Sequence, residues 1–307
     1  MTSLRLRIIG AIIRPGARAM MTRAQDPNRL RRVFDLSSRL FFRRVRGAVS
    51  TPVADPQSLP LGGLWVSAGK VAPRPVILYF HGGGYLAGSP NTHRHMAARL
   101  SQLSGLKVFL PQYRLAPEHP LPACLDDADA AYAYLRTQGY AARDIILGGD
   151  SAGGGIALSL LSKLCKNGQH PAACFAWSPF CDQTFSGASV RENGRIDHFF
   201  PGDRVHDLAD MILGDTAADD PRVSPLFAEF PDCPPVLIQA SQCEILRDDA
   251  VRMVKKLADA SADAQVDLWD NAPHVWQIFD GWFPEARAAI AKTAQFLSSR
   301  MPQKDEN

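Results

Sequence analysis

Residues 145–155 read Ile-Ile-Leu-Gly-Gly-Asp-Ser-Ala-Gly-Gly-Gly, and they are the strongest indicator of the fold in this sequence. An apolar run typical of a buried strand leads into a Gly-Asp-Ser-Ala-Gly turn, and a helical pattern follows over 152–165. Glycines at 149 and 153 remove the Cβ atoms that such a sharp strand-to-helix turn would bring into collision. The pattern therefore predicts that Ser151 stands on a strained turn above a sheet. Its hydroxyl would lie at a helix N-terminus, where the dipole favours developing negative charge.

The chain around this turn alternates between short apolar runs and helical segments. The expected strands are 64–67, 76–80, 107–111, 145–149, 174–178, 236–240 and 265–269. The expected helices are 92–103, 122–137, 152–165, 249–260 and 284–299. Alternation at this spacing predicts βαβ units, and hence an α/β protein with a mostly parallel central sheet and helices on both faces. Ligands of such sheets bind at the carboxyl ends of the strands.

Two segments interrupt this alternation. Residues 1–45 are helical without strand partners, and residues 183–222 form an insertion rich in Asp, Gly and Arg that also holds apolar side chains. We expect both to fold together as a helical cap over the carboxyl edge of the sheet. The core would then consist of residues 46–182 and 223–307.

Composition restricts the class of protein. The chain has 307 residues, 46% of them hydrophobic, which suits one large or two small globular domains and excludes whole-chain disorder. No apolar run approaches the ~18 residues of a membrane-spanning helix, so we expect no stable membrane insertion. The six cysteines show no CxxC spacing, which favours reduced, buried thiols in a cytoplasmic protein and no metal site.

The strongly positive charge of the N-terminal segment is compatible with several kinds of partner. Residues 1–50 hold twelve arginines, no lysine and two acidic residues, a net charge of +10, whereas the remainder of the chain carries −7. Such a segment can bind nucleic acid, bind an anionic membrane surface or act as a transit peptide. It can also be a basic amphipathic helix that packs on an acidic body. We favour packing over nucleic acid, because no recognition motif accompanies the charge.

A second glycine-rich motif, His81-Gly82-Gly83-Gly84-Tyr85, directly follows an expected strand. Three glycines allow the backbone to turn its N–H groups toward a developing oxyanion. We assign the amides of Gly83, Gly84 and Ala152 to this role, and His81 to the orientation of the loop. A phosphate-binding loop is the weaker interpretation, because the GxGxxG spacing and the P-loop lysine are missing.

A nucleophilic serine needs a base, and in hydrolases with this strand–turn–helix motif an acid and then a histidine follow the serine along the chain. His274 comes just after the last expected strand and is the predicted base, since the other histidines after Ser151 lie in a turn or in the insertion. Glu244, Asp248 and Asp249 compete for the role of the acid. We choose Glu244, which lies nearest the end of its strand, and expect Asp248 to cap the following helix.

Together, HGGGY (81–85), GDSAGGG (149–155), YRLAPEHP (113–120) and EILRDD (244–249) with the later HVW (274–276) resemble the bacterial hormone-sensitive-lipase-like branch of the α/β-hydrolases. The resemblance covers about residues 60–300. It implies an α/β-hydrolase fold with a helical cap and carboxylester hydrolysis without a cofactor. The expected substrate is a small-molecule ester with a short-to-medium acyl chain.

The resemblance also implies roles for single residues. His81, Gly82 and Gly83 would form the marked oxyanion stretch, and many members carry Asp where Glu244 stands. In YRLAPEHP an ion pair between Arg114 and Glu118 would brace the site, with a surface role equally open. Relatives often dimerise through the last strand, here near 265–269, so a homodimer is one option.

The sequence also offers candidate walls for a substrate pocket, and it leaves alternative functions open. Cap and loop side chains are the candidate pocket walls, namely Phe34, Phe41, Phe185, Phe199, Phe200, Leu213, Leu246 and Val275. The same site suits a lactone, a carbamate or an arylformamide, since all form the same kind of oxyanion. A non-catalytic small-molecule-binding protein is the weakest alternative, because nucleophile, acid and base are all present.

Overall fold

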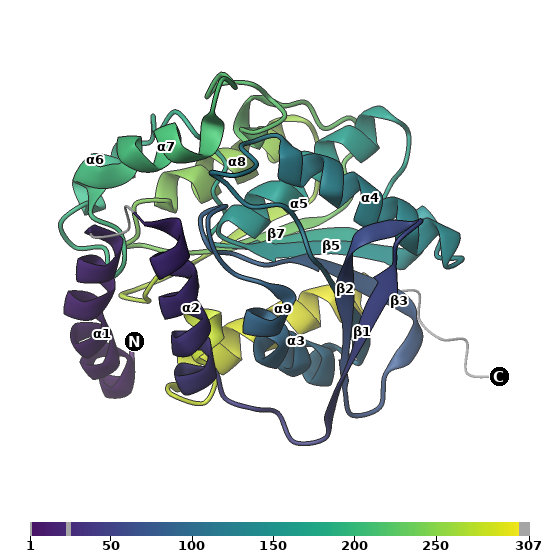
Figure 1. Cartoon of the computed structure of the whole chain (residues 1–307), viewed down its shortest axis with the longest axis horizontal. Coiled ribbons are helices and arrows are strands. Elements are labelled where there is room, and N and C mark those ends of the chain that lie inside the picture. The colour runs from purple at the N-terminus through teal and green to yellow at the C-terminus, as the bar shows by residue number, and fades with distance from the viewer. Residues whose placement is uncertain (1, 23–25, 301–307) are drawn as a thin grey trace.

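A computed structural model describes residues 2–22 and 26–300 of the chain. Its strands are β1 (Ala48–Asp55), β2 (Leu59–Ala68), β3 (Ala72–Phe80), β4 (Leu106–Pro111), β5 (Ile145–Asp150), β6 (Ala173–Trp177), β7 (Val236–Ser241) and β8 (Ala264–Trp269). They form one sheet in the order β1-β2-β4-β3-β5-β6-β7-β8 (Figure 1). The run from β4 to β8 is parallel, whereas β1 and β2 are antiparallel to their neighbours. The predicted mostly parallel sheet is confirmed.

Helices cover both faces of this sheet, as predicted (Figure 1). One face carries α3 (Pro90–Ser104) and α9 (Pro284–Ser299), and the other carries α4 (Ala123–Thr137), α5 (Ala152–Lys166) and α8 (Arg247–Asp259). Alternate residues of β3 therefore enter two cores. Leu78 and Phe80 pack in the cluster that holds α4 and α5, while Ile77 and Tyr79 pack in the cluster of α3 and α9. A strand buried on both faces has the continuous apolar sequence that parallel sheets require.

The N-terminal segment and the mid-chain insertion lie side by side at the carboxyl edge of the sheet (Figure 1). They contain α1 (Leu4–Thr22), α2 (Pro27–Phe41), α6 (Ala188–Asn193) and α7 (Val205–Leu213). The guanidinium of Arg18 in α1 donates hydrogen bonds to the carbonyl oxygens of Gly194, Asp197 and Phe200 in the insertion. We call residues 2–45 and 183–222 together the cap segments.

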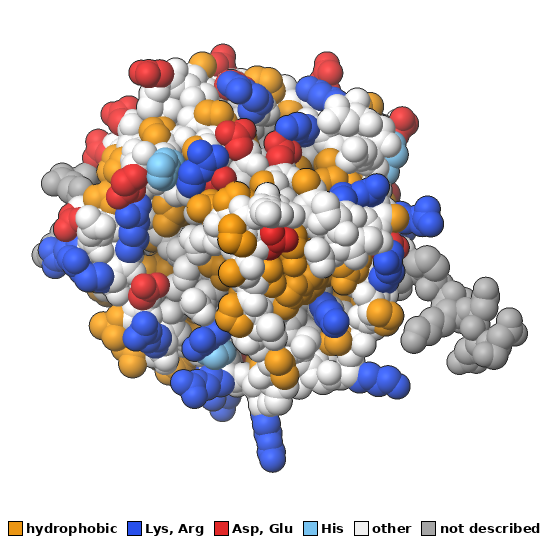
Figure 2. All heavy atoms as spheres, turned by 45° about the vertical axis from the view of Figure 1, so that its right-hand side comes forward, with side chains coloured by type: hydrophobic (Ala, Val, Ile, Leu, Met, Phe, Trp, Pro, Cys, Tyr) orange, Lys and Arg blue, Asp and Glu red, His pale blue; other side chains and the backbone are white. Residues whose placement is uncertain are grey.

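Short 3₁₀ turns link the longer elements, at Ala142–Asp144, Gly202–Arg204, Pro225–Phe227 and Trp276–Phe279. Five of the six cysteines are buried free thiols and Cys233 is partly buried. Among the described helices, none is long and apolar enough to cross a membrane. On the face drawn in Figure 2, acidic side chains gather in the upper half, and basic side chains predominate in the lower half.

The structure adds a strand that was not expected, and it moves the start of one helix near the site. β1 was not predicted, because its side chains are mostly exposed and it includes Pro52, so it lacks the apolar pattern of a core strand. Helix α8 begins at Arg247, two residues earlier than expected, which places Asp248 inside the first turn. The carboxylate of Asp248 accepts the backbone N–H of Ser189 in α6, so the prediction that Asp248 is the helix cap is wrong.

Candidate active site

Ser151 lies between the last residue of β5 and the first residue of α5, on a strained backbone. Its φ of 52° and ψ of −122° fall in a region that non-glycine residues rarely adopt. Two backbone hydrogen bonds hold the turn, from the Ser151 N–H to the Trp177 carbonyl at 2.8 Å and from the Phe180 N–H to the Ser151 carbonyl at 3.0 Å. A Cβ at Gly149 or Gly153 would collide with backbone atoms. The sequence thus folds into this turn because glycine occupies both of the crowded positions.

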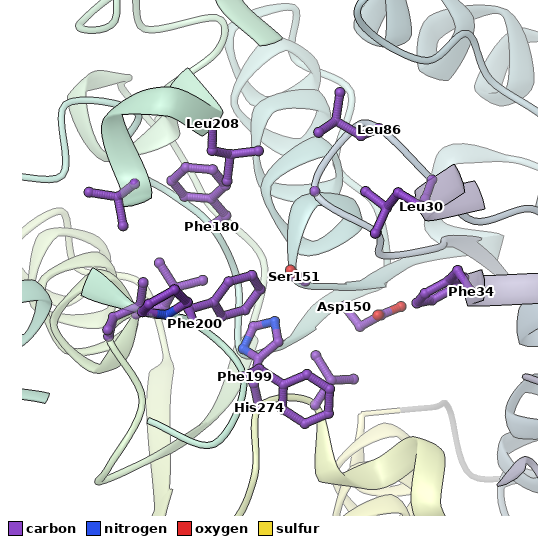
Figure 3. Close-up of a pocket in the computed structure, with 18 of the residues that line it drawn as sticks. Leu30, Phe34, Leu86, Asp150, Ser151, Phe180, Phe199, Phe200, Leu208 and His274 are labelled. Atoms are coloured by element: carbon purple, nitrogen blue, oxygen red, sulfur yellow. The ribbon is translucent and has the colours of Figure 1, made fainter. Parts of the chain in front are cut away.

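His274 and Glu244 reach the same edge of the sheet from loops after β8 and β7. Nδ1 of His274 lies 2.6 Å from Oε2 of Glu244, and both side chains are buried. Oε1 of Glu244 accepts the backbone N–H of Ser241 at 2.7 Å, which fixes the carboxylate. Nε2 of His274 is buried and has no hydrogen-bond partner among the described residues. Ser151 and His274 line one pocket, and Figure 3 shows the imidazole ring beside the Ser151 hydroxyl.

The other two candidate acids, both in the first turn of α8, are engaged elsewhere. Asp249 is buried and accepts the backbone N–H groups of Cys181 and Asp182 at 2.8 and 3.0 Å. Asp248 forms an ion pair with Arg247 in addition to its bond to the cap segment. Glu244 is therefore the carboxylate of this loop that reaches the imidazole.

The loop at 81–85 places its glycine backbone in the same pocket. Gly83 and Gly84 line the pocket together with Ser151 and have φ values of 129° and 63°. Gly82 is placed differently, since its N–H donates to Oδ1 of Asp150 at 3.0 Å. Ala152 is the first residue of α5, so its N–H has no acceptor within the helix. Gly83, Gly84 and Ala152 therefore remain the candidate amide donors to an oxyanion.

Buried aromatic and polar side chains hold the glycine-rich loop at 81–85 in place. The His81 ring stacks on Tyr113 with ring centroids 4.2 Å apart, and the Tyr113 hydroxyl donates to the His81 carbonyl at 2.6 Å. Burial lowers the pKa of His81 to about 3, so the ring stays neutral at neutral pH. His81 does not line the pocket, which fits a role in orienting the loop.

Asp150 connects this loop with the serine turn. Its Oδ1 accepts the Tyr79 hydroxyl at 2.7 Å as well as the Gly82 N–H, and its Oδ2 lies 3.4 Å from Nε2 of His93. Burial on its own would raise the pKa of Asp150, but His93 and the Tyr79 hydroxyl bring this pKa below its ordinary value. The sequence analysis missed His93, whose position in a helical stretch gave no signal.

Asp197 is a second residue that the sequence analysis missed. Its buried carboxylate accepts the N–H groups of Phe199, Phe200 and Ile245 at 2.7, 3.0 and 2.8 Å. These bonds join the insertion to the loop that holds Glu244. They also place the Phe200 ring edge-on to His274, with centroids 4.9 Å apart. The signal available in the sequence was an Asp that stands two residues before two consecutive aromatic residues.

The pocket is apolar, with a cavity volume of about 140 Å³. Six of the eight predicted wall residues line it, namely Phe34, Phe185, Phe199, Phe200, Leu246 and Val275. The expectation for Phe41 and Leu213 is wrong. Phe41 packs against Trp282 on the outside of α2, and Leu213 is buried in the core cluster. The sequence missed further apolar wall residues, namely Leu30, Leu86, Phe180, Val205, Leu208, Met211, Ile245 and Ile278.

The expected ion pair between Arg114 and Glu118 is also wrong. Arg114 binds the carboxylate of Asp127 at 2.9 Å. Glu118 binds Arg31 of α2 at 2.6 Å, and this hydrogen bond lowers the pKa of Glu118 to about 2. Arg31 also donates to the carbonyl oxygen of Leu86 at 2.8 Å, so it ties α2 to the glycine loop. Sequence proximity favoured the wrong partner, because α2 meets this segment only in the folded chain.

A strained serine after a central parallel strand, with an imidazole–carboxylate pair at the same sheet edge, defines an α/β-hydrolase. Residues 77–278 match the family model described as alpha/beta hydrolase fold. An "Esterase" of Acinetobacter venetianus is 33% identical over 277 residues, 89% of either chain. An "Acetyl-hydrolase" of Streptomyces hygroscopicus is 35% identical over 234 residues, 76% of this chain and 78% of that protein.

A solved structure supports the same assignment. A crystal structure of an esterase from the bacterial hormone-sensitive lipase family superposes with a TM-score of 0.90 at 33% identity, over 98% of this chain and all of that one. The chain belongs to the bacterial hormone-sensitive-lipase-like esterases of the α/β-hydrolase family. It is accordingly a hydrolase of carboxylic esters.

Proposed function

We propose that this carboxylesterase works through a Ser151–His274–Glu244 triad and an acyl-enzyme intermediate. The observation that carries the proposal is the state of His274. Its Nδ1 is held by Glu244 at 2.6 Å, whereas its buried Nε2 has no partner among the described residues and shares a pocket with Ser151. That arrangement fixes the tautomer in which Nε2 accepts a proton.

The reaction then proceeds in two halves. Oγ of Ser151 attacks the ester carbonyl carbon while Nε2 of His274 takes the hydroxyl proton. The oxyanion binds the amides of Gly83, Gly84 and Ala152, where one such donor is typically worth ~10²–10³ in rate. The ester C–O bond breaks, and His274 gives its proton to the leaving alcohol. In the second half a water molecule attacks the acyl-serine, His274 takes its proton and returns it to Ser151, and the acid leaves.

The pocket supports short-to-medium acyl chains. Its volume of about 140 Å³ is close to that of an apolar cavity of roughly 150 Å³ that accepts benzene. The rings of Phe180, Phe185 and Phe200 line the same pocket as Ser151, so we expect them to limit the length of the acyl channel. The name acetyl-hydrolase of one relative agrees with a small acyl group.

The test is a series of p-nitrophenyl esters of increasing acyl length, with the Ser151→Ala variant as the control. We expect the wild type to prefer short-to-medium acyl chains and to be labelled by a fluorophosphonate probe. Ser151→Ala should bind the same esters without turnover and take no label. Near-wild-type hydrolysis by Ser151→Ala would contradict the proposed mechanism.

A further inference from the structure

Helix α1 carries apolar side chains on two opposite faces. Leu6, Ile9 and Ile13 pack on the cluster around Trp276 and α9. Leu4, Ile8 and Ile12 stand on the opposite face at i, i+4 and i+8, with 70%, 50% and 72% of their surface exposed. Single exposed apolar residues are ordinary, but a continuous exposed stripe along one helix marks an interaction surface.

The neighbouring helix also exposes apolar side chains. Leu36 and Leu40 of α2 are 58% and 66% exposed, and Phe41 is 42% exposed at its end. Trp282 links the two helices, because it packs on the cluster that holds Leu6 and donates its indole N–H to the Phe41 carbonyl at 2.7 Å. Figure 1 shows α1 and α2 on the same side of the molecule, beneath α6 and α7.

Arginines surround these apolar residues. Eight of them are exposed on and after the two helices, namely Arg5, Arg7, Arg29, Arg32, Arg39, Arg43, Arg44 and Arg46. Arg43 also lies over the Trp282 ring, 5.0 Å from its centroid. Residues 1–50 carry a net charge of +10 while the remainder carries −7. We call these arginines, with the exposed apolar residues of α1 and α2, the docking face.

We propose that the docking face binds an anionic lipid surface. Exposed Leu and Ile side chains flanked by arginine are the composition of a helix that lies in the membrane interface, with its apolar side chains ~5–10 Å deep. A second copy of the chain is the weaker occupant, because an isologous dimer would bring two strongly basic faces together. Nucleic acid is also weaker, since its phosphates leave the exposed Leu and Ile side chains without an apolar partner.

Docking would place the pocket close to the lipid. The same helix α2 that exposes Leu36 and Leu40 supplies Leu30 and Phe34 to the pocket wall (Figure 3). An ester that partitions into the interface would then reach the pocket beside α2. The proposal itself does not depend on the triad assignment, since binding is measured without turnover.

The experiment is co-sedimentation of the full-length protein with vesicles. We expect binding to phosphatidylcholine vesicles that contain phosphatidylserine, no binding to phosphatidylcholine alone, and release as the salt concentration rises. Ile8→Gln with Ile12→Gln should weaken binding, and Arg5→Gln with Arg7→Gln should weaken it by roughly fivefold per arginine. The matched control is Val251→Gln on α8, a 39% exposed position outside the docking face, which should bind as the wild type does.

Two further measurements separate the outcomes. All variants should hydrolyse a soluble short-chain ester at the wild-type rate and keep the wild-type melting temperature, because the substituted side chains are exposed and outside the pocket. Absence of wild-type binding to phosphatidylserine vesicles at low salt would overturn the proposal. So would wild-type binding by the Ile8→Gln and Ile12→Gln variant, or a dimer that this variant dissociates, which would identify the occupant as a second copy.

Discussion

At the scale of the residue, the site depends on how each polar side chain is held. Glu244 uses one carboxylate oxygen on a backbone N–H and the other on His274, so it orients the imidazole, and in the proposed mechanism it stabilises the imidazolium that forms. Asp150 joins the serine turn to the glycine loop. Motif and chain order were sufficient to single out Ser151, His274 and Glu244 as the candidate triad, and the structure brings them to one edge of the sheet. Sequence reasoning missed His93 and Asp197, whose roles arise from contacts between distant segments.

Glu244→Gln should reduce kcat far more than Asp248→Asn. The amide can present an N–H to Nδ1 and so favour the wrong imidazole tautomer, which costs roughly 10⁴-fold in a comparable triad. Asp248 contacts Ser189 and Arg247 and not the imidazole, so its substitution should change kcat little. Steady-state kinetics on one short ester checks both variants. A larger loss for Asp248→Asn would reassign the acid.

The buried His81 should make the protein less stable in mild acid. Its folded-state pKa is about 3, against 6.5 for an ordinary histidine, so between these values the unfolded chain binds a proton that the folded chain does not. The free energy of unfolding is therefore not reduced by His81 above pH 6.5. As the pH falls from 6.5 toward 3, protonation of the unfolded chain lowers this free energy by up to about 1.4 kcal/mol per pH unit.

The measurement is the free energy of unfolding in urea between pH 7 and 5, with the variants His81→Gln and His119→Gln. His81→Gln should show a shallower pH dependence than the wild type, whatever its absolute stability. His119 is exposed, so its variant should follow the wild-type curve. Equal slopes for the wild type and His81→Gln would contradict the assignment.

At the scale of the element, the strands and helices of the core were predictable because their apolar periodicity reflects burial on one or two faces. All seven predicted strands and all five predicted core helices are present, with boundaries that differ by a few residues. β1 could not be recognised, since an exposed edge strand pairs through its backbone and needs no apolar pattern. The pairing of Arg31 with Glu118 also lay beyond the sequence, because it joins α2 to a distant segment.

Arg31→Met should loosen α2. The variant loses hydrogen bonds to the carbonyl oxygens of Leu86 and Ala116, at 2.8 and 2.9 Å, as well as the ion pair with Glu118. At about 1 kcal/mol for each hydrogen bond, the free energy of unfolding should fall by roughly 2 kcal/mol. Because Leu30 and Phe34 of α2 line the pocket, KM should rise while kcat changes little.

Arg32→Met is the matched control, since Arg32 lies on the exposed side of the same helix. It should keep the wild-type KM and unfolding free energy. Urea unfolding and steady-state kinetics measure both quantities. If the two variants behave alike, the contact of Arg31 with the glycine loop has no part in holding α2.

At the scale of the whole molecule, the pocket is built where the core and the two cap segments meet. Its walls come from α2, the glycine loop, the insertion and the loops after β7 and β8. Sequence reasoning placed both cap segments near the active edge, and six of the eight wall residues that it named line the pocket. It could not tell the inner face of α2 from the outer one, where Phe41 lies, because both faces carry aromatic or aliphatic residues.

Phe185→Ala should extend the range of acyl chains that the enzyme accepts. The ring lines the pocket and lies 5.0 Å from Phe180, so its removal enlarges the space beyond Ser151. Leu213→Ala is the control, because Leu213 is as buried but faces the core. Both changes should cost roughly 2–5 kcal/mol of stability. The ratio of kcat/KM for a longer to a shorter ester should rise for Phe185→Ala alone.

The backbone conformation of Ser151 lowers the stability of the folded chain at the position that the proposed mechanism needs for activity. A positive φ costs a serine roughly 1–3 kcal/mol, whereas a glycine adopts it with little penalty. In the proposed mechanism, serine at this position is therefore the poorer choice for the folded chain and the necessary choice for turnover. Engineering that selects variants of this esterase for heat resistance alone would favour glycine at 151, and we expect the resulting protein to be inert.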